Sequence, residues 1–226
     1  MLNRAITLAA LAVLTVEPIR AQQTRDLAPY LIGDRAAEVA LARTAAPSNV
    51  SDSATVLVLT RKGFVTAVQG TNGFTCLVIR SFAKSIGAPD FWNPRVRSPH
   101  CLNAPAVRTV LPEMLKRAEW IMTGVSPATI AERTRRAYAS HAFPMPAAGA
   151  MAFMLSPRQH LTDTDPHWLP HLMFYYDRSM PATAWGAGGA TNTLIDGSAP
   201  DSPIFTLLIP VRRWSDGKPG PAAGPA

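Results

Sequence analysis

The side chains best suited to chemistry are concentrated between positions 160 and 171. This segment holds three of the five histidines and two aspartates within twelve residues. Imidazole and carboxylate groups are common protein ligands of zinc and of other divalent metal ions. The composition therefore suggests a metal site, with zinc as the candidate ion and with these ligands: His160, Asp163, Asp165, His167 and His171.

The spacing within this segment restricts such a site. His167 and His171 are four positions apart, which suits a helix, but Pro166 and Pro170 disfavour a helix there. In an extended strand the two side chains would share a face but lie about 13 Å apart, which is too far for one ion. The alternative is a polar loop that leads into a strand, with the two aspartates as turn residues.

Aromatic residues in the same part of the chain suggest a different kind of site. His171, Tyr175 and Trp185 could line a groove that binds a small molecule or a peptide. A histidine beside an aromatic strand can equally be a satisfied core group, so both interpretations of His171 stay open. The chain lacks the G-x-S-x-G spacing of a nucleophile elbow and lacks a P-loop, and no residue is assigned a catalytic role.

The two cysteines, Cys76 and Cys101, are 25 positions apart. In an oxidising compartment they are expected to form a disulfide, which would contribute about 3 kcal/mol to stability. Two buried free thiols are one alternative. A Cys76 nucleophile is another, although the neighbouring sequence shows no Cys–His arrangement that would activate it.

The N-terminus has the pattern of an export signal. A short positively charged start, residues 1–4, precedes a predominantly apolar run of twelve residues, 5–16. That run is too short to cross a bilayer core of about 30 Å as a helix. We expect residues 1–21 to be a signal peptide, with a retained anchor as the alternative. The mature protein is then periplasmic or secreted, with no transmembrane segment.

Composition excludes several classes of protein. Hydrophobic residues make up 47% of the 226 positions, which is enough for a core and argues against disorder of the whole chain. Two cysteines are too few for a disulfide-dense scaffold. The net charge of +7 would fall to +6 without residues 1–21. Because the basic residues are dispersed, they are expected to form a solvated face, and no nucleic-acid partner is predicted.

Hydrophobic periodicity and turn residues predict an α+β chain. Three strands near the N-terminus are expected to form an antiparallel meander, and a proline-rich surface loop should occupy 87–105. Two helices with a short connection predict an αα-hairpin. The expected strands are 54–60, 64–69, 74–80, 150–155, 171–176 and 204–211, and the expected helices are 35–43, 109–122 and 126–140.

These elements predict an antiparallel sheet of about five or six strands, with the αα-hairpin inserted between its N- and C-terminal halves. The length suggests one domain. We expect a flexible segment at 22–33, a single α+β domain at 34–216 and a disordered Pro/Gly/Ala tail at 217–226.

Three stretches together carry a resemblance to known sequences. They are EVALARTAAP at 38–47, GTNGFTCLV at 70–78 and PHLMFY at 170–175. Over roughly residues 35–214 the chain resembles a group of uncharacterised, exported bacterial proteins. The resemblance implies bacterial export and one compact domain, and it implies no activity, cofactor or catalytic residue.

The expected function is therefore that of a non-catalytic envelope or secreted domain that binds a ligand or a partner. The partner would be a small molecule or an envelope component, and no cofactor is assigned. The alternative is a metal-assisted hydrolase in which His160, His167 and His171 hold an ion that activates water. A structural protein that uses its sheet edge or its basic face is a third hypothesis.

Overall fold

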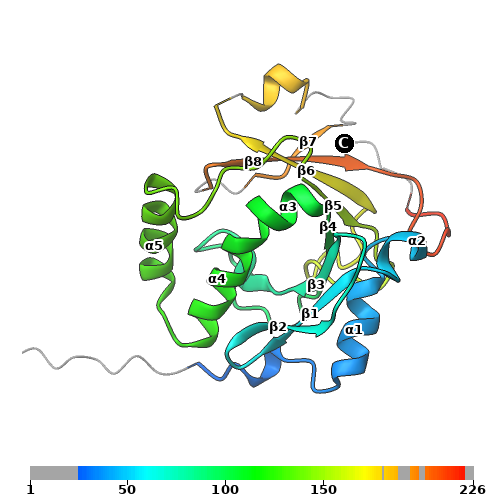
Figure 1. The fold of residues 1–226 in the computed structure, drawn as a ribbon, viewed down its shortest axis with the longest axis horizontal. Helices are drawn as coiled ribbons and strands as arrows, with labels where there is room; N and C mark the ends of the chain where they lie inside the picture. The colour runs from blue at the N-terminus through cyan, green and yellow to red at the C-terminus, as the bar shows by residue number, and fades with distance from the viewer. Residues whose placement is uncertain (1–24, 180, 188–193, 199–201, 222–226) are drawn as a thin grey trace, which may run out of the picture.

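The computed structural model describes residues 25–179, 181–187, 194–198 and 202–221. The expected signal peptide, residues 1–21, lies outside these ranges. Within them, eight strands form one sheet in the order β2-β1-β3-β4-β5-β6-β8-β7 (Figure 1). The strands are β1 (Thr55–Thr60), β2 (Gly63–Val68), β3 (Thr75–Ile79), β4 (Ser98–Leu102), β5 (Met151–Met154), β6 (His171–Asp177), β7 (Ile195–Asp196) and β8 (Ile204–Pro210).

Helices α1 (Arg35–Arg43) and α5 (Pro127–Ala139) begin after residues whose side chains cap them. Asp34 accepts hydrogen bonds from two amides at the start of α1, and the Ser126 hydroxyl accepts one from the Thr129 amide in α5. No helix in the described ranges is both long enough and apolar enough to cross a bilayer. The helices are α1 (Arg35–Arg43), α2 (Ser48–Ser51), α3 (Ala104–Thr109), α4 (Leu111–Met122) and α5 (Pro127–Ala139), with short 3-10 turns η1 (Ala28–Tyr30), η2 (Ser81–Ala83) and η3 (Ala182–Trp185).

The α+β class is confirmed, but the sheet has more strands than the five or six expected. The main addition is β4, which lies inside the proline-rich stretch that was predicted to be a loop. Proline cannot donate a hydrogen bond to a sheet ladder, so it is confined mostly to edge positions. Pro99 satisfies this rule because β5 pairs with β4 only at Cys101 and Leu102, which leaves Pro99 beyond the paired region. The two-residue strand β7 was also missed.

The predicted meander is correct for its first turn and wrong for its second. β1 and β2 form an antiparallel hairpin, whereas β3 lies on the other side of β1 and runs parallel to it. The connection at residues 69–74 therefore crosses over the end of β1. Gly70 allows this crossing, because a Cβ there would lie 2.2 Å from the backbone of Ala54 and Thr55.

Helices cover both faces of the sheet (Figure 1). Successive side chains of a strand point to opposite faces, so apolar residues on each face need a covering layer. Leu41 and Ala42 of α1 pack with Val56, Cys76 and Val78 on one face. On the opposite face, the region of α3 and α4 packs against the sheet. Helix α5 contacts α4, where its buried Ile130 joins the cluster around Ala118 and Ile121.

The predicted disulfide between Cys76 and Cys101 is confirmed. The two residues are direct partners in the β3–β4 ladder, so the bond joins neighbouring strands rather than a strand and a loop. Both cysteines are completely buried under α1.

A buried ion pair connects α1 to the end of β3. The Arg80 guanidinium donates to Glu38 Oε1 over 2.7 Å, and both side chains are at most 1% exposed. The same guanidinium donates to the carbonyl oxygens of Tyr30 and Val78. Glu38 Oε1 also accepts from the Leu59 amide of β1. One pair of charges thus links the N-terminal segment, α1, β1 and β3.

The two expected flexible ends make contacts where they are described. Tyr30, within the predicted flexible segment 22–33, is buried, and its hydroxyl donates to the Trp92 carbonyl over 2.6 Å. In the predicted tail, the Gly220 amide donates to the Arg212 carbonyl over 2.8 Å. Residues 22–24 and 222–226 lie outside the described ranges.

The substitution Glu38→Gln is expected to lower the free energy of unfolding by about 3–5 kcal/mol, because it leaves the buried Arg80 charge without a counter-charge. Glu132→Gln is the matched control, since Glu132 pairs with Arg136 on the surface at 52% and 72% exposure. That change should cost less than about 1 kcal/mol. Urea unfolding of the two variants tests this, and equal losses would contradict it.

Candidate functional site

A chamber of about 480 Å³ lies between the sheet and helix α4. Most of the side chains that line it are apolar, but two histidines project into it from the sheet. The sheet contributes Ser98, His100, Met154, His171, Met173, Tyr175, Thr206 and Leu208, and α4 contributes Glu113, Met114, Arg117 and Ala118.

Strand pairing brings the two histidines to either side of one methionine. His171 of β6 pairs directly with Met154 of β5. In the neighbouring ladder Cys101 pairs with Phe153, so the preceding residue of β4, His100, comes opposite Met154. The three side chains form a row across β4, β5 and β6 on the chamber side of the sheet.

The predicted ligand-binding residues are divided between the two faces of the sheet. Tyr175 lies four positions after His171 in β6 and lines the chamber with it. Burial raises the pKa of the Tyr175 hydroxyl, which lies 3.6 Å from the Met173 sulfur. Trp185 lies on the opposite face, where its ring centroid is 4.4 Å from that of Tyr176. The structure therefore brings His171 and Tyr175 together and separates Trp185 from them.

The two imidazole rings are held in the same tautomer by backbone carbonyls. His100 Nδ1 is 3.0 Å from the Ser98 carbonyl oxygen, and His171 Nδ1 is 2.7 Å from that of Leu169. Because a carbonyl oxygen can only accept, each Nδ1 must carry the proton. In a neutral ring Nε2 is then an acceptor, and the hydrogen bonds of both rings within the described residues involve Nδ1 alone.

Burial keeps both rings neutral. It lowers the pKa of His100 and of His171 to about 4, against an ordinary value of 6.5. The carbonyl hydrogen bonds oppose this shift, and the nearby His100 adds a small further lowering at His171. At neutral pH the chamber therefore contains two uncharged Nε2 lone pairs.

The charged groups of the chamber are paired with other groups. Glu113 accepts from Arg117 over 3.4 Å and from the Tyr138 hydroxyl over 2.6 Å. Arg117 also donates to the Lys84 carbonyl over 2.9 Å. The Lys84 ammonium pairs with Asp90 and donates to the Leu161 carbonyl. Arg117 Nε is a buried donor without a partner in the described ranges, so the free polar groups of the chamber include this N–H as well as the two imidazole Nε2 atoms.

Trp168 packs against one of the two histidines. Its ring centroid is 4.8 Å from that of His171, in an edge-to-face arrangement. The Gln159 side chain, which is itself buried, donates to the Trp168 carbonyl. An indole in this position should report on the occupancy of the chamber through its fluorescence.

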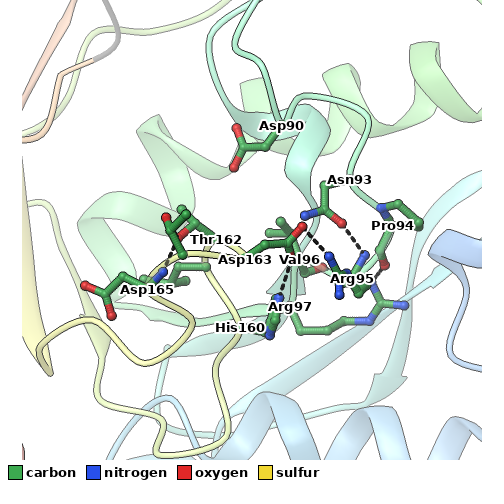
Figure 2. Close-up of polar contacts among 12 residues, drawn as sticks. Asp90, Asn93, Pro94, Arg95, Val96, Arg97, His160, Thr162, Asp163 and Asp165 are labelled. Carbon is green, nitrogen blue, oxygen red and sulfur yellow. Dashed lines mark hydrogen bonds and ion pairs between the residues drawn. The ribbon is translucent and has the colours of Figure 1, made fainter.

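The histidine- and aspartate-rich segment that leads to β6 forms a polar loop (Figure 2). His160 Nε2 lies 3.0 Å from Asp163 Oδ1, and the other carboxylate oxygen pairs with Arg95. Hydrogen bonding by His160 is the largest of the effects that lower the pKa of Asp163 to about 2. The Asp165 amide donates to the Thr162 hydroxyl, which is a turn contact.

The five residues considered as metal ligands are not brought to one point. His160 and Asp163 bond to each other, His167 is exposed, and His171 is buried in the chamber wall. Over the described part of the chain, no group of three or more His, Cys, Asp or Glu side chains is placed to hold a metal ion.

Sequence reasoning missed His100, Met154 and Met173. His100 lies in the proline-rich stretch that is expected from the sequence to be a loop. Residues two apart, such as Ser98 and His100, share a face only in a strand, so their common orientation could not be predicted without β4. The two methionines lie in strands that were predicted correctly. Only the register of those strands shows that they flank the histidines.

The two buried histidines predict a loss of stability in mild acid. Their pKa values are ordinary in the unfolded chain and depressed in the folded one, so the unfolded chain binds more protons between pH 6.5 and pH 4. The free energy of unfolding should therefore fall as the pH is lowered through this window, by up to about 3 kcal/mol per histidine. Urea unfolding at pH 7 and pH 4.5 measures the change.

The double variant His100→Asn/His171→Asn is the control, because the Asn amide can still donate to the carbonyls but does not titrate. Its stability should change much less over this window. Asp163 does not interfere, since its lowered pKa affects stability only below about pH 4. Parallel losses in the wild type and the double variant would show that other groups cause the pH dependence.

Comparisons with known proteins add no assignment. No protein family, curated protein or solved structure matches the chain. The chamber and its paired histidines are therefore the features from which a function can be inferred.

Proposed function

We propose that this chain is an exported binding protein that holds a small ligand in the chamber between the sheet and α4. The observation that carries the proposal is the pair of Nε2 atoms on His100 and His171. Both rings are fixed by backbone carbonyls and uncharged, and no hydrogen bond to either Nε2 is found among the described residues. Neither Nε2 is among the fully buried side-chain atoms that lack a partner in the described ranges, so both are accessible from the chamber, and a ligand that donates a hydrogen bond to them gains affinity and specificity.

The shape and lining of the chamber suit a small ligand. Its volume of about 480 Å³ lies within the range of small-molecule sites, which are mainly apolar with a few convergent polar groups. Methionine side chains from both walls, Met114, Met154 and Met173, adapt easily to the shape of a ligand. The two Nε2 lone pairs require a ligand that offers a hydrogen-bond donor or accepts an electron pair.

The arrangement favours binding over acid–base catalysis. The Ser98 hydroxyl is 3.5 Å from His100 Nδ1, but this nitrogen carries a proton and cannot accept another. The Glu113 carboxylate already accepts from Arg117 and Tyr138. A histidine base would have to act through Nε2, and a pKa near 4 makes it a weak base at neutral pH.

Two features support the proposed export. The N-terminal residues 1–21 have the pattern of a signal peptide. The disulfide between Cys76 and Cys101 is of the kind that persists in an oxidising compartment. We accordingly propose that the protein is periplasmic or secreted and that its partner is a small molecule.

The chamber should bind phenol more tightly than anisole, which has the same ring and no hydroxyl donor. One hydrogen bond to a neutral acceptor contributes about 0.5–1.5 kcal/mol, so the expected difference is roughly 2- to 12-fold in dissociation constant. Tryptophan fluorescence titration and calorimetry measure both affinities. Equal affinities would contradict a role for the Nε2 atoms.

A chamber-filling variant tests the location of binding. Met114→Trp places an indole in the chamber from α4 and should abolish the binding of both probes. Lys116→Trp is the matched control, since Lys116 is exposed on the same helix and does not line the chamber. Thermal unfolding should show that both variants are folded. Undiminished phenol binding by Met114→Trp would overturn the proposal.

A further inference from the structure

Four soft or borderline donor groups line the same part of the chamber wall. His100, Met154 and His171 form a row across three adjacent strands, and Met173 lies two positions after His171 on the same face. Because neighbouring strands are about 4.8 Å apart, the outer histidines of this row are separated by about 10 Å at their Cα atoms. Imidazole side chains of that separation can converge on a point between them, above Met154.

Each imidazole ring makes a hydrogen bond to a backbone carbonyl of the kind that is typical of metal-ligating histidines. Such a histidine almost always donates its second ring N–H to a carboxylate, a backbone carbonyl or water. In His100 and His171 the donor is Nδ1 and the acceptors are the carbonyls of Ser98 and Leu169, at 3.0 and 2.7 Å. A histidine that serves only the core would be expected to have both nitrogens satisfied or enclosed in apolar surroundings, whereas here Nε2 belongs to a chamber wall.

The thioethers are also held by neighbouring groups. The Ser98 hydroxyl lies 3.8 Å from the Met154 sulfur, and the Tyr175 hydroxyl lies 3.6 Å from the Met173 sulfur. Each sulfur keeps a second lone pair for another partner. Methionine has three rotatable side-chain bonds, so both sulfurs can move toward an ion in the chamber.

The donor set discriminates between metals. Thioether sulfur is a soft ligand that favours copper(I), and imidazole suits copper as well as zinc. Divalent ions are usually held with the help of thiolates or carboxylates, but Cys101 is in a disulfide and Glu113 is bonded to Arg117 and Tyr138. Neutral ligands do not offset the charge of a bound ion, and burying a charge in a largely apolar chamber is costly. The chamber therefore favours a soft ion of single charge over a divalent ion.

We propose that His100, Met154, His171 and Met173 form a copper(I) site in the chamber. This inference rests on the proposed function and names the ligand class: the two Nε2 lone pairs bind the ion together with the two thioethers. The stoichiometry is one copper per chain. No electron transfer is involved, because the ion enters and leaves as copper(I).

The test is an anaerobic titration of the full chain with tetrakis(acetonitrile)copper(I) in competition with bicinchoninate. One copper(I) per chain is expected to be withdrawn from the chelator. Met154→Leu and His171→Asn should each raise the dissociation constant at least tenfold. His171→Asn keeps an amide donor for the Leu169 carbonyl and removes Nε2, so a purely structural role of the ring would leave copper binding unchanged.

Matched controls lie outside the row. Met151→Leu changes a methionine of the same strand, three positions before Met154 and on the other face of β5, and should bind copper as the wild type does. His160→Asn changes a histidine of the polar loop and should also have no effect. X-ray absorption should show nitrogen and sulfur neighbours of copper, with the sulfur contribution reduced in Met154→Leu.

The outcomes separate this inference from the proposed function. Failure to withdraw copper from the chelator, equal affinity in all variants, or equally tight zinc(II) binding would overturn the copper site. If phenol still binds in a manner that Met114→Trp abolishes, the chamber remains a binding site for another ligand. If neither copper nor phenol binds, both proposals are wrong. Circular dichroism and thermal unfolding establish that each variant is folded.

Discussion

The Arg80 guanidinium is completely buried at the end of β3, and its hydrogen-bonding requirements determine how the N-terminal half of the fold is assembled. Its donors reach Glu38 of α1 and the carbonyls of Tyr30 and Val78, while Glu38 also accepts from the Leu59 amide. A buried charge without such partners would be strongly unfavourable. The pair therefore holds α1 and the N-terminal segment against the central strands.

The position of β3 in turn determines the position of the candidate site. β3 pairs with β4 along its whole length, and the disulfide joins the two strands at Cys76 and Cys101. His100 is the neighbour of Cys101, so it points to the opposite face from the disulfide. The bond that lies under α1 thus helps to hold a histidine in the chamber on the other side of the sheet.

Polar groups in the chamber region differ in how fully they are satisfied. The Glu113 carboxylate of α4 is paired, both Nη atoms of Arg117 have partners while its Nε has none, and the polar loop uses His160 and Asp163 for its own contacts. Only one nitrogen of each chamber histidine is engaged among the described residues. This difference, rather than the number of titratable residues in a stretch of sequence, identifies where a ligand is expected to bind.

The local sequence was sufficient for the α+β class, for the helices that begin after Asp34 and Ser126, and for six of the eight strands found in the described ranges. Capping residues and apolar periodicity act over a few positions, so these features can be predicted locally. The local sequence also pointed to the disulfide, since two cysteines allow one intramolecular pair. The histidine-rich segment suggested a metal site that its residues do not form in the described structure, because closeness along the chain says little about convergence in space.

The tertiary structure decided the parallel pairing of β1 with β3, the strand character of β4 and the row from His100 to His171. These features depend on strand register and on the satisfaction of buried groups such as Arg80, which are set by contacts between residues far apart in the chain.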